Sequence, residues 1–273
     1  MAPIKAKFLR PIRANQGLKF RYQKQMLALI DEMRNSVEFW IEAQYKKAPP
    51  LLAQDASPSP SKKMQSRFKR IAKQWKNRFE EAAPKIAEAY LKGQFKATDS
   101  AMRMALRDAG IAVKFKMTPA MRDAFNASLT ENVGLIRSIP EEYLQQVEGI
   151  VARSYATGRD LQTMVKRLKR LYPTAANRAV LIARDQSNKA NAVTEQARRL
   201  ELGIQKAMWL HSHGGKVPRP EHVKAGQERR IFDVAKGCPI PNEKGVIEYI
   251  LPGEKINCRC VSRSILTGLK IAV

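Results

Sequence analysis

Apolar side chains recur at three- and four-residue steps along most of this chain, and this spacing constrains its fold more than any other feature. Within residues 18–45 the apolar positions at this spacing are Met26, Leu29, Ile30, Met33, Val37, Trp40 and Ile41. Such a run forms one apolar stripe on an α-helix. Similar runs continue, with breaks, to about residue 202. The sequence therefore predicts a largely helical body.

Proline and serine punctuate the first half of the chain. Pro49-Pro50 predicts the end of the first helix, and the Pro/Ser-rich stretch 48–61 predicts a linker or exposed loop. A second helix is expected over residues 61–92, and Pro84 inside it should kink or divide it. Its apolar face is formed by Phe68, Ile71, Trp75 and Phe79.

Capping signals mark further helix boundaries. Thr118-Pro119 predicts an N-cap followed by proline at the first helical position. The segment Ser138-Ile-Pro-Glu141 has the pattern of a capping box and predicts a new helix start. Gly158 predicts the stop of that helix, Asp160 caps the next one, and Pro173 ends it.

A long helix is expected from Thr174, as its N-cap, to about Leu202, closed by Gly203. One stripe of it carries small side chains: Ala176, Val180, Ala183, Ser187, Ala190, Thr194 and Ala197. Small side chains let a neighbouring helix approach closely, so the stripe indicates packing and not chemistry. The basic residues of this helix are expected to point elsewhere and add to the basic surface: Arg178, Arg184, Lys189, Arg198 and Arg199.

After Gly203 the pattern changes to short apolar runs separated by turns. The runs 207–210, 231–232, 246–251 and 260–266 predict short strands. The expected fold is therefore α+β, mainly α: an elongated helical body followed by a small C-terminal β-rich module. The expected consecutive domains are a basic N-terminal arm (1–17), an N-terminal helical region with the linker at 48–61 (18–117), a helical core (118–203) and a C-terminal β-rich Cys/His module (204–273).

Charge is the main global feature. Lys and Arg number 50 against 25 Asp and Glu, so the net charge is +25 and the isoelectric point is near 10.2. A field of this size repels itself unless a polyanion offsets it, and nucleic acid is the commonest such partner. We expect non-specific contact with double-stranded DNA, partly through a mobile, solvated N-terminal arm. The candidate contacts are Lys5, Lys7, Arg10, Arg13, Lys62, Lys63, Arg67, Lys69, Arg70 and Lys73.

The alternatives for this charge are a merely soluble basic protein, with a solvated face over a core stripe, or a helix that binds a membrane surface. No run of about eighteen apolar residues is present, so we expect no bilayer crossing. The N-terminus lacks the apolar stretch of a signal peptide, so we expect the protein to stay in the compartment where it is made.

All histidines and cysteines lie in the C-terminal module. Cys258 and Cys260 are two residues apart, so on a strand they face the same way. Thiolates and imidazole suit zinc, and His222, Cys238, Cys258 and Cys260 would supply a closed structural Zn²⁺ site. The alternative is that the cysteines are small buried hydrophobes and His222 is a hydrogen-bonded core histidine.

Enzyme classes find little support. A Cys–His nucleophile would need an orienting acid, and the spacing shows none. No glycine-rich phosphate loop is present, and the paired carboxylates lack the clustering that a metal nuclease needs. A sequence-specific regulator would need a helix-turn-helix that binds palindromic DNA as a dimer, and the sequence shows no evident motif of this kind. We therefore name no catalytic residue and expect a protein that is not an enzyme.

Several segments together resemble the Mu F-like minor head (head morphogenesis) proteins of tailed phages. They are the stretch from Trp209 through Arg219-Pro-Glu-His222, Ile231-Phe-Asp233, and the ending Leu251-Pro-Gly-Glu-Lys-Ile-Asn-Cys-Arg-Cys260. Segment 131–141, Gly158 with its following helix, and Arg178-Ala-Val-Leu-Ile-Ala-Arg-Asp185 look like the same family. The resemblance covers roughly residues 118–265.

The resemblance implies a capsid-associated protein that works near the portal during procapsid assembly. The implied partners are the portal protein and the major capsid or scaffolding proteins. The implied location is the virion, inside the head near the portal, with host cytoplasm during assembly. The matched signature residues, with no established catalytic role, are Trp209, His222, Pro252, Gly253, Asn257, Cys258, Arg259 and Cys260. The alternative is a metal-dependent nucleic-acid-processing enzyme or a toxin-like protein.

Overall fold

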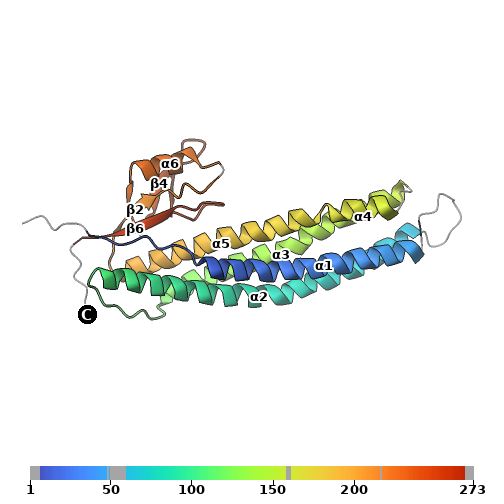
Figure 1. Ribbon diagram of the computed structural model, residues 1–273, viewed down its shortest axis with the longest axis horizontal. Helices are drawn as coiled ribbons and strands as arrows, with labels where there is room; N and C mark the ends of the chain where they lie inside the picture. The colour runs from blue at the N-terminus through green and yellow to red at the C-terminus, as the bar shows by residue number, and fades with distance from the viewer. Residues whose placement is uncertain (1–6, 48, 50–59, 158–160, 216, 268–273) are drawn as a thin grey trace, which may run out of the picture. The chain divides into compact units, whose positions relative to one another are not determined.

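A computed structural model describes residues 7–47, 49, 60–157, 161–215 and 217–267 (Figure 1). Its helices are α1 (Gln16–Lys47), α2 (Pro60–Asp108), α3 (Pro119–Ala156), α4 (Leu161–Lys169), α5 (Tyr172–Glu201) and α6 (Pro220–Gln227). Its strands are β1 (Lys7–Phe8), β2 (Lys206–Leu210), β3 (Ile231–Asp233), β4 (Cys238–Pro241), β5 (Ile247–Ile250) and β6 (Val261–Leu266). The predicted fold class is confirmed: a mainly helical chain ends in a small β-rich part.

The chain divides into two compact units that draw on several stretches of sequence. The first unit contains residues 1–20, 88–130 and 183–273. The second contains residues 21–87 and 131–182. Helices α1, α2, α3 and α5 therefore contribute to both units. The consecutive domain boundaries expected from the sequence remain a prediction.

In the second unit the predicted apolar stripes form the interior. Met26, Ile30 and Met33 of α1 are fully buried, and Phe68 and Trp75 of α2 are almost so. Lysines and arginines of α2 occupy its exposed face. The two sides of α2 thus have the amphipathic character that its sequence predicts.

Two predicted helix boundaries are wrong. Pro84 does not divide its helix, since it lies inside α2, which runs on to Asp108 and keeps its buried stripe on both sides of the proline. The predicted kink at Pro84 stays a prediction. Pro140 likewise lies inside α3, so Ser138 does not cap a helix. The Ser138 hydroxyl instead donates to the carbonyl of Leu135 at 2.7 Å, within the same helix. A proline removes one helical hydrogen bond, and packing on both sides of it compensates here.

Other boundaries agree with the sequence. The amide of Met121 donates to the Thr118 hydroxyl at 3.2 Å, so Thr118 is the predicted N-cap of α3. Gly203, with a φ of +70°, follows the end of α5. The start of α5 was misplaced, because Pro173 lies in its first turn and Thr174 follows it. Gly158, Asp160 and nearly all of the predicted linker at 48–61 fall outside the described residues.

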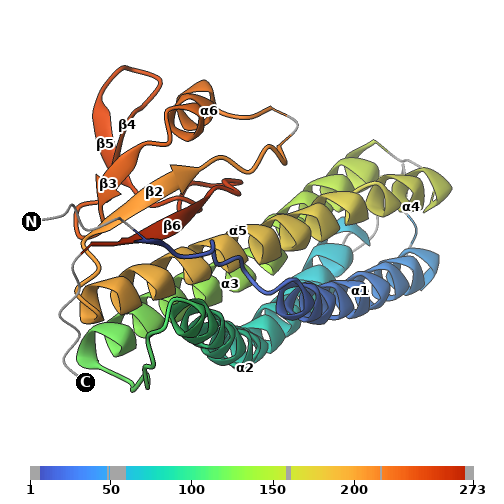
Figure 2. The same cartoon turned by 60° about the vertical axis from the view of Figure 1, so that its left-hand side comes forward.

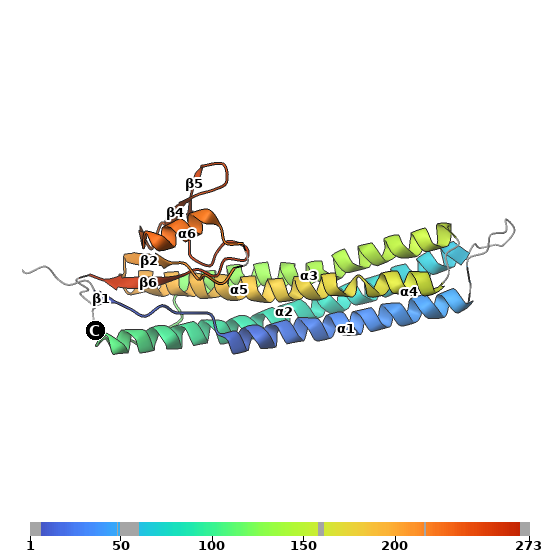
Figure 3. The same ribbon diagram turned by 45° about the horizontal axis from the view of Figure 1, so that its top comes forward.

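The β-rich part of the first unit contains two small antiparallel sheets. One sheet has the strand order β1-β6-β2-β3, and the other pairs β4 with β5. Each of the four predicted apolar runs matches a strand, β2, β3, β5 or β6. The sequence reading missed β1, the proline-containing β4 and helix α6. Figure 2 and Figure 3 show β2 and β6 running beside the part of α5 that belongs to this unit.

The described part of the N-terminal arm is packed, not solvated as expected. Lys7 and Phe8 pair with Leu266 and Ile265 of β6. Leu9 and Ile12 are buried in a core cluster with the end of α2. The β1–β6 pairing holds this segment at the edge of the sheet, because the apolar side chains beside it enter the core.

The expectation that Arg198 and Arg199 add to the basic surface is also wrong. Both side chains are buried, 2% and 4% exposed. Arg198 donates to both carboxylate oxygens of Asp99 at 2.7 Å and to Glu201 at 2.6 Å. Its guanidinium therefore has the charged partners that a buried cation needs.

Arg199 links α5 to β6. Its guanidinium donates to the hydroxyls of Ser264 and Ser262, at 2.9 and 2.8 Å, and to the Glu195 carboxylate. Glu195 is 2% exposed, and the amide of Asn191 donates to it at 2.8 Å. Burial raises the pKa of Glu195 to about 7, against the opposing effects of Arg199 and Asn191. The charged pair is thus enclosed between helix and sheet.

Replacing Arg199 with leucine should destabilise the protein strongly. The change leaves the Glu195 carboxylate buried without its cation, and breaking a buried ion pair costs about 3–5 kcal/mol. Chemical denaturation of the full chain measures this loss. Lys92→Ala is the matched control, since it removes an exposed 2.8 Å pair with Glu88 and should cost at most about 0.5 kcal/mol. Equal small effects of the two changes would contradict the role of Arg199.

Candidate functional site

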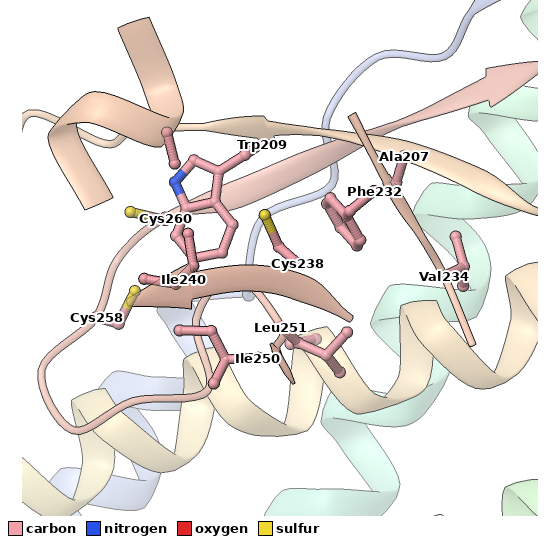
Figure 4. Packing of buried hydrophobic residues seen from close by; sticks show 12 residues of the cluster. Ala207, Trp209, Phe232, Val234, Cys238, Ile240, Ile250, Leu251, Cys258 and Cys260 are labelled. Carbon is pink, nitrogen blue, oxygen red and sulfur yellow. The ribbon is translucent and has the colours of Figure 1, made fainter. Parts of the chain in front are cut away.

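The β-rich part encloses a core around Trp209, whose side chain is fully buried (Figure 4). Strands β2 and β4 contribute Trp209, Cys238 and Ile240, and the segment before β6 contributes Cys258 and Cys260. Three of the four predicted metal ligands, Cys238, Cys258 and Cys260, therefore share one apolar core. Helix α6 supplies the fourth, His222, which is 4% exposed.

His222, Cys258 and Cys260 converge in this core. The Sγ of Cys258 lies 3.4 Å from Nδ1 of His222, and the Sγ of Cys260 lies 4.0 Å from the same nitrogen. The ligand atoms of all three side chains lie within 4.8 Å of one another. The imidazole packs edge-on against the Trp209 ring, with centroids 5.0 Å apart. The sequence thus identified a real side-chain cluster in three of its four proposed ligands.

Cys238 stands apart from that cluster. It is fully buried, yet it does not belong to the group of ligand atoms within 4.8 Å. In the view of Figure 4 its sulfur and that of Cys260 lie on opposite sides of the Trp209 ring. Burial raises its pKa to about 11, so Cys238 is a neutral thiol of the apolar core.

The pKa values of the other two thiols shift in opposite directions. The pKa of Cys258 is lowered, first because Cys260 donates to its sulfur and further because of His222, while burial opposes both. The pKa of Cys260 is raised by its bond to Cys258 and by burial, against smaller effects of the Ser212 backbone and the Trp209 indole. The cluster therefore favours one thiolate beside the imidazole.

The segment between β5 and β6 is held against α5. The amide of Asn257 donates to Asp185 at 3.1 Å, and Arg184 donates to the side-chain oxygen of Asn257. The side-chain amide of Asn188 donates to the carbonyl of Cys258 at 2.8 Å. Asn257 has a φ of +62°, a left-handed conformation that asparagine tolerates better than most residues. These bonds fix the backbone that presents Cys258.

The Pro-Gly-Glu part of the signature forms the preceding turn. The Glu254 carboxylate accepts from the amide of Leu251 at 2.6 Å, which closes the turn. Gly253 has a φ of +96°, and a Cβ there would lie 3.3 Å from the carbonyl oxygens of Asn188 and Cys260. Only glycine meets both conditions without strain. Pro252 is buried beside it.

Arg259 binds a different segment of the chain. Its guanidinium donates to the carbonyl of Gly214, in the loop that follows β2. That loop and the Cys258–Cys260 segment line a hollow of about 250 Å³. Arg219, His211 and His222 line the same hollow. Arg259 therefore connects two walls of the cavity beside the cluster.

Sequence reasoning missed the polar face of α5. Asp185, Asn188, Asn191, Glu195 and Arg199 are spaced by three or four residues and lie beside the small-residue stripe. All of them except Asn188 are buried. Each forms a hydrogen bond either to the segment before β6 or to β6, or to another residue of this polar face. The three- and four-residue spacing of these polar residues could have predicted this face from the sequence.

The predicted nucleic-acid contacts are divided between the two units. Lys62, Lys63, Arg67 and Arg70 line a hollow of about 540 Å³ in the second unit, with Lys47. The Arg67 guanidinium lies 4.0 Å from the centre of the Trp40 ring. Lys69 and Lys73 are exposed on the same helix, and Arg13 is exposed in the first unit.

Two further contacts have structural partners in the first unit. Lys7 donates to the carbonyl of Ala109 at 2.8 Å, and Arg10 lies 3.6 Å from Asp108. Lys5 falls outside the described residues. The strongest basic surface among the predicted contacts is therefore the one on α2.

Comparisons with known proteins agree with the resemblance noted in the sequence. Residues 145–263 match the family described as Phage Mu protein F like protein, which confirms it. An uncharacterized protein of Haemophilus influenzae is 27% identical over 265 residues, which cover 96% of this chain and 56% of that protein. The chain thus spans little more than half the length of this relative. No solved structure matches the chain.

Gly226 of α6 lets the helix rest directly on the end of β2. A Cβ at this position would lie 2.4 Å from Cβ and 2.9 Å from the amide nitrogen of His211. Gly226→Ala should therefore destabilise the protein by about 1–3 kcal/mol, the usual cost of overpacking. Chemical denaturation checks this value.

Gly134→Ala is the matched control for that experiment. Gly134 is exposed inside α3, and a Cβ there would meet nothing within 4 Å. This change should stabilise the protein by roughly 0.5–1 kcal/mol, because alanine loses less backbone entropy in a helix. A neutral result for Gly226→Ala would show that α6 does not rest on His211 as described.

Proposed function

We propose that this chain, a Mu F-like phage protein over residues 145–263, is a minor capsid and head morphogenesis protein that acts near the portal in procapsid assembly. The family match carries the proposal. The match includes α6, strands β2 to β5, the first half of β6 and the segment that holds His222, Cys258 and Cys260 together. Its partners would be the portal protein and the major capsid or scaffolding proteins, and its location the virion head.

The structure offers bonding roles for most signature residues. Pro252, Gly253 and Asn257 shape a turn, and Arg259 ties that turn to the loop after β2. Among the described residues, the one group of potential metal ligands is His222 with the two cysteines. This composition supports a structural role over that of a metal-dependent nuclease.

Non-specific contact with packaged DNA is the second part of the proposal. The hollow lined by Lys47, Lys62, Lys63, Arg67 and Arg70 is rich in cations, and phosphate contacts need no sequence preference. No helix in the described part of the chain is both long and apolar enough to cross a membrane. The cations that line the hollow on α2 support a polyanion as its partner.

The head assignment is tested on particles of the phage or prophage that encodes the chain. Procapsids and mature heads are purified, and the chain is quantified by mass spectrometry and located by electron cryomicroscopy. We expect a low copy number and density at the portal vertex. Particles that assemble normally with no copy of the chain, when the chain is expressed, would overturn the assignment.

DNA contact is tested with random-sequence duplex at several salt concentrations. The double variant Lys63→Glu/Arg70→Glu should bind at least about tenfold more weakly at low salt, with a salt slope reduced by about two. Lys224→Glu/Lys244→Glu is the control, since it changes the net charge equally at two exposed positions of the first unit.

Equal losses in both variants would show that net charge alone, and not the α2 face, attracts DNA. Undetectable binding of the unaltered chain at low salt would remove the DNA contact and leave the head assignment standing.

A further inference from the structure

We propose that His222, Cys258 and Cys260, together with His211, bind one zinc ion that holds α6, the loop after β2 and the segment before β6 together. This site is separate from the proposed head function and could exist without it. Helix α6 supplies His222, and the other ligands come from segments on either side of it. The ion would thus join three pieces of chain that are far apart in sequence.

The spacing of the three buried ligand atoms fits a tetrahedral ion. With zinc–sulfur bonds of about 2.3 Å and zinc–nitrogen bonds of about 2.0–2.1 Å, neighbouring corners stand roughly 3.5–3.8 Å apart. The two sulfur–nitrogen separations to His222 are 3.4 and 4.0 Å. All three ligand atoms lie within 4.8 Å of one another. An ion would need only small adjustments of these side chains.

The surroundings suit thiolates. The indole Nε1 of Trp209 is buried, makes no hydrogen bond of regular geometry among the described residues, and acts on the sulfur of Cys260. In Figure 4 this nitrogen lies on the side of Cys260. A sulfur that carries negative charge would be its natural acceptor, and donors around metal-bound groups commonly fix and tune them. Binding of the ion would therefore also satisfy a buried donor.

His211 would supply the fourth ligand. Its ring nitrogens lie outside the group of ligand atoms within 4.8 Å of one another, so its side chain would have to turn toward the cluster. His211 lies at the end of β2 and lines the same hollow of about 250 Å³ as His222, Cys258 and Cys260. Its backbone position is set by the close approach of Gly226. The Nδ1 of His211 lies 3.4 Å from Nδ1 of His213, and metal binding would replace this contact with a bond to the ion. His213, with a φ of +52°, does not line that hollow and serves as the comparison residue.

The donor set favours zinc over other ions. Two thiolates and two imidazoles are ligands for zinc, whereas calcium and magnesium take oxygen. An iron–sulfur cluster with four cysteine ligands needs one more cysteine than the chain has. A [2Fe–2S] cluster with two cysteines and two histidines binds them on different irons, whereas here both sulfurs lie 3.4 and 4.0 Å from Nδ1 of His222. A set of four protein ligands leaves no open position, so the site would be structural and not catalytic.

The test uses the full chain, purified under reducing conditions without chelator from cells supplied with zinc. Elemental analysis should find about one zinc per chain in the unaltered protein. Cys258→Ser, Cys260→Ser and His222→Asn should each lose it. Cys238→Ser should keep it, because this cysteine is equally buried but lies outside the cluster. Absence of zinc from the unaltered protein would overturn the site.

Two measurements separate ligation from folding. Circular dichroism of each variant shows whether the fold persists, and cobalt added to the chelated, unaltered chain should give the absorption of a tetrahedral thiolate site. Absence of that spectrum in folded apoprotein would count against the proposal, as would equal zinc loss in Cys238→Ser.

The fourth ligand is tested by His211→Asn and His213→Asn. The first change should weaken zinc affinity at least about tenfold, within the range seen when one ligand or its support is removed, and the second should leave it unchanged. Equal affinities in both variants would overturn the assignment of His211 and leave a three-ligand site.

Discussion

A continuous chain of buried hydrogen bonds governs the arrangement of the first unit. The Asn15 amide donates to Gln94, Gln94 to Thr98 and Thr98 to Asn191, at 3.2, 3.1 and 3.0 Å. The chain then passes through Glu195 and Arg199 to the serines of β6. Buried polar groups are costly unless each has a partner, so only one register of these segments satisfies all of them. The position of β6 on α5 follows from that requirement.

Helix α5 also positions the Asn257-Cys258-Arg259-Cys260 segment. One side of this segment is bonded to α5 through Asp185 and Asn188, and the other presents its sulfurs to His222. Its asparagine and arginine are therefore needed for shape, whereas its cysteines supply chemistry. The signature therefore has two parts: a turn that is hydrogen-bonded to α5, and two cysteines that form a cluster of potential metal ligands with His222.

The sequence predicted what depends on local periodicity and not what depends on partners. The apolar stripes located the helices, and short apolar runs located four strands, because burial of one face imposes these spacings. Pro84 and Pro140 were misread, since only tertiary packing shows that a helix can continue through them. Strand β4 was missed because its prolines argue against a strand, and β1 because it contains two residues. Arg198 and Arg199 look like surface residues until Asp99 and Glu195 are placed beside them.

The candidate site shows the same division. Strand geometry predicted that Cys258 and Cys260 would share a face. They lie instead in the segment before β6, where both sulfurs still come close to His222 through the packing of α6. Cys238 was grouped with them by chemistry, yet β4 carries it to a separate part of the core. His211 had no distinguishing signal beyond its residue type, because its position depends on the contact with Gly226. Ligand identity follows from residue type, whereas membership of a site follows from which elements meet.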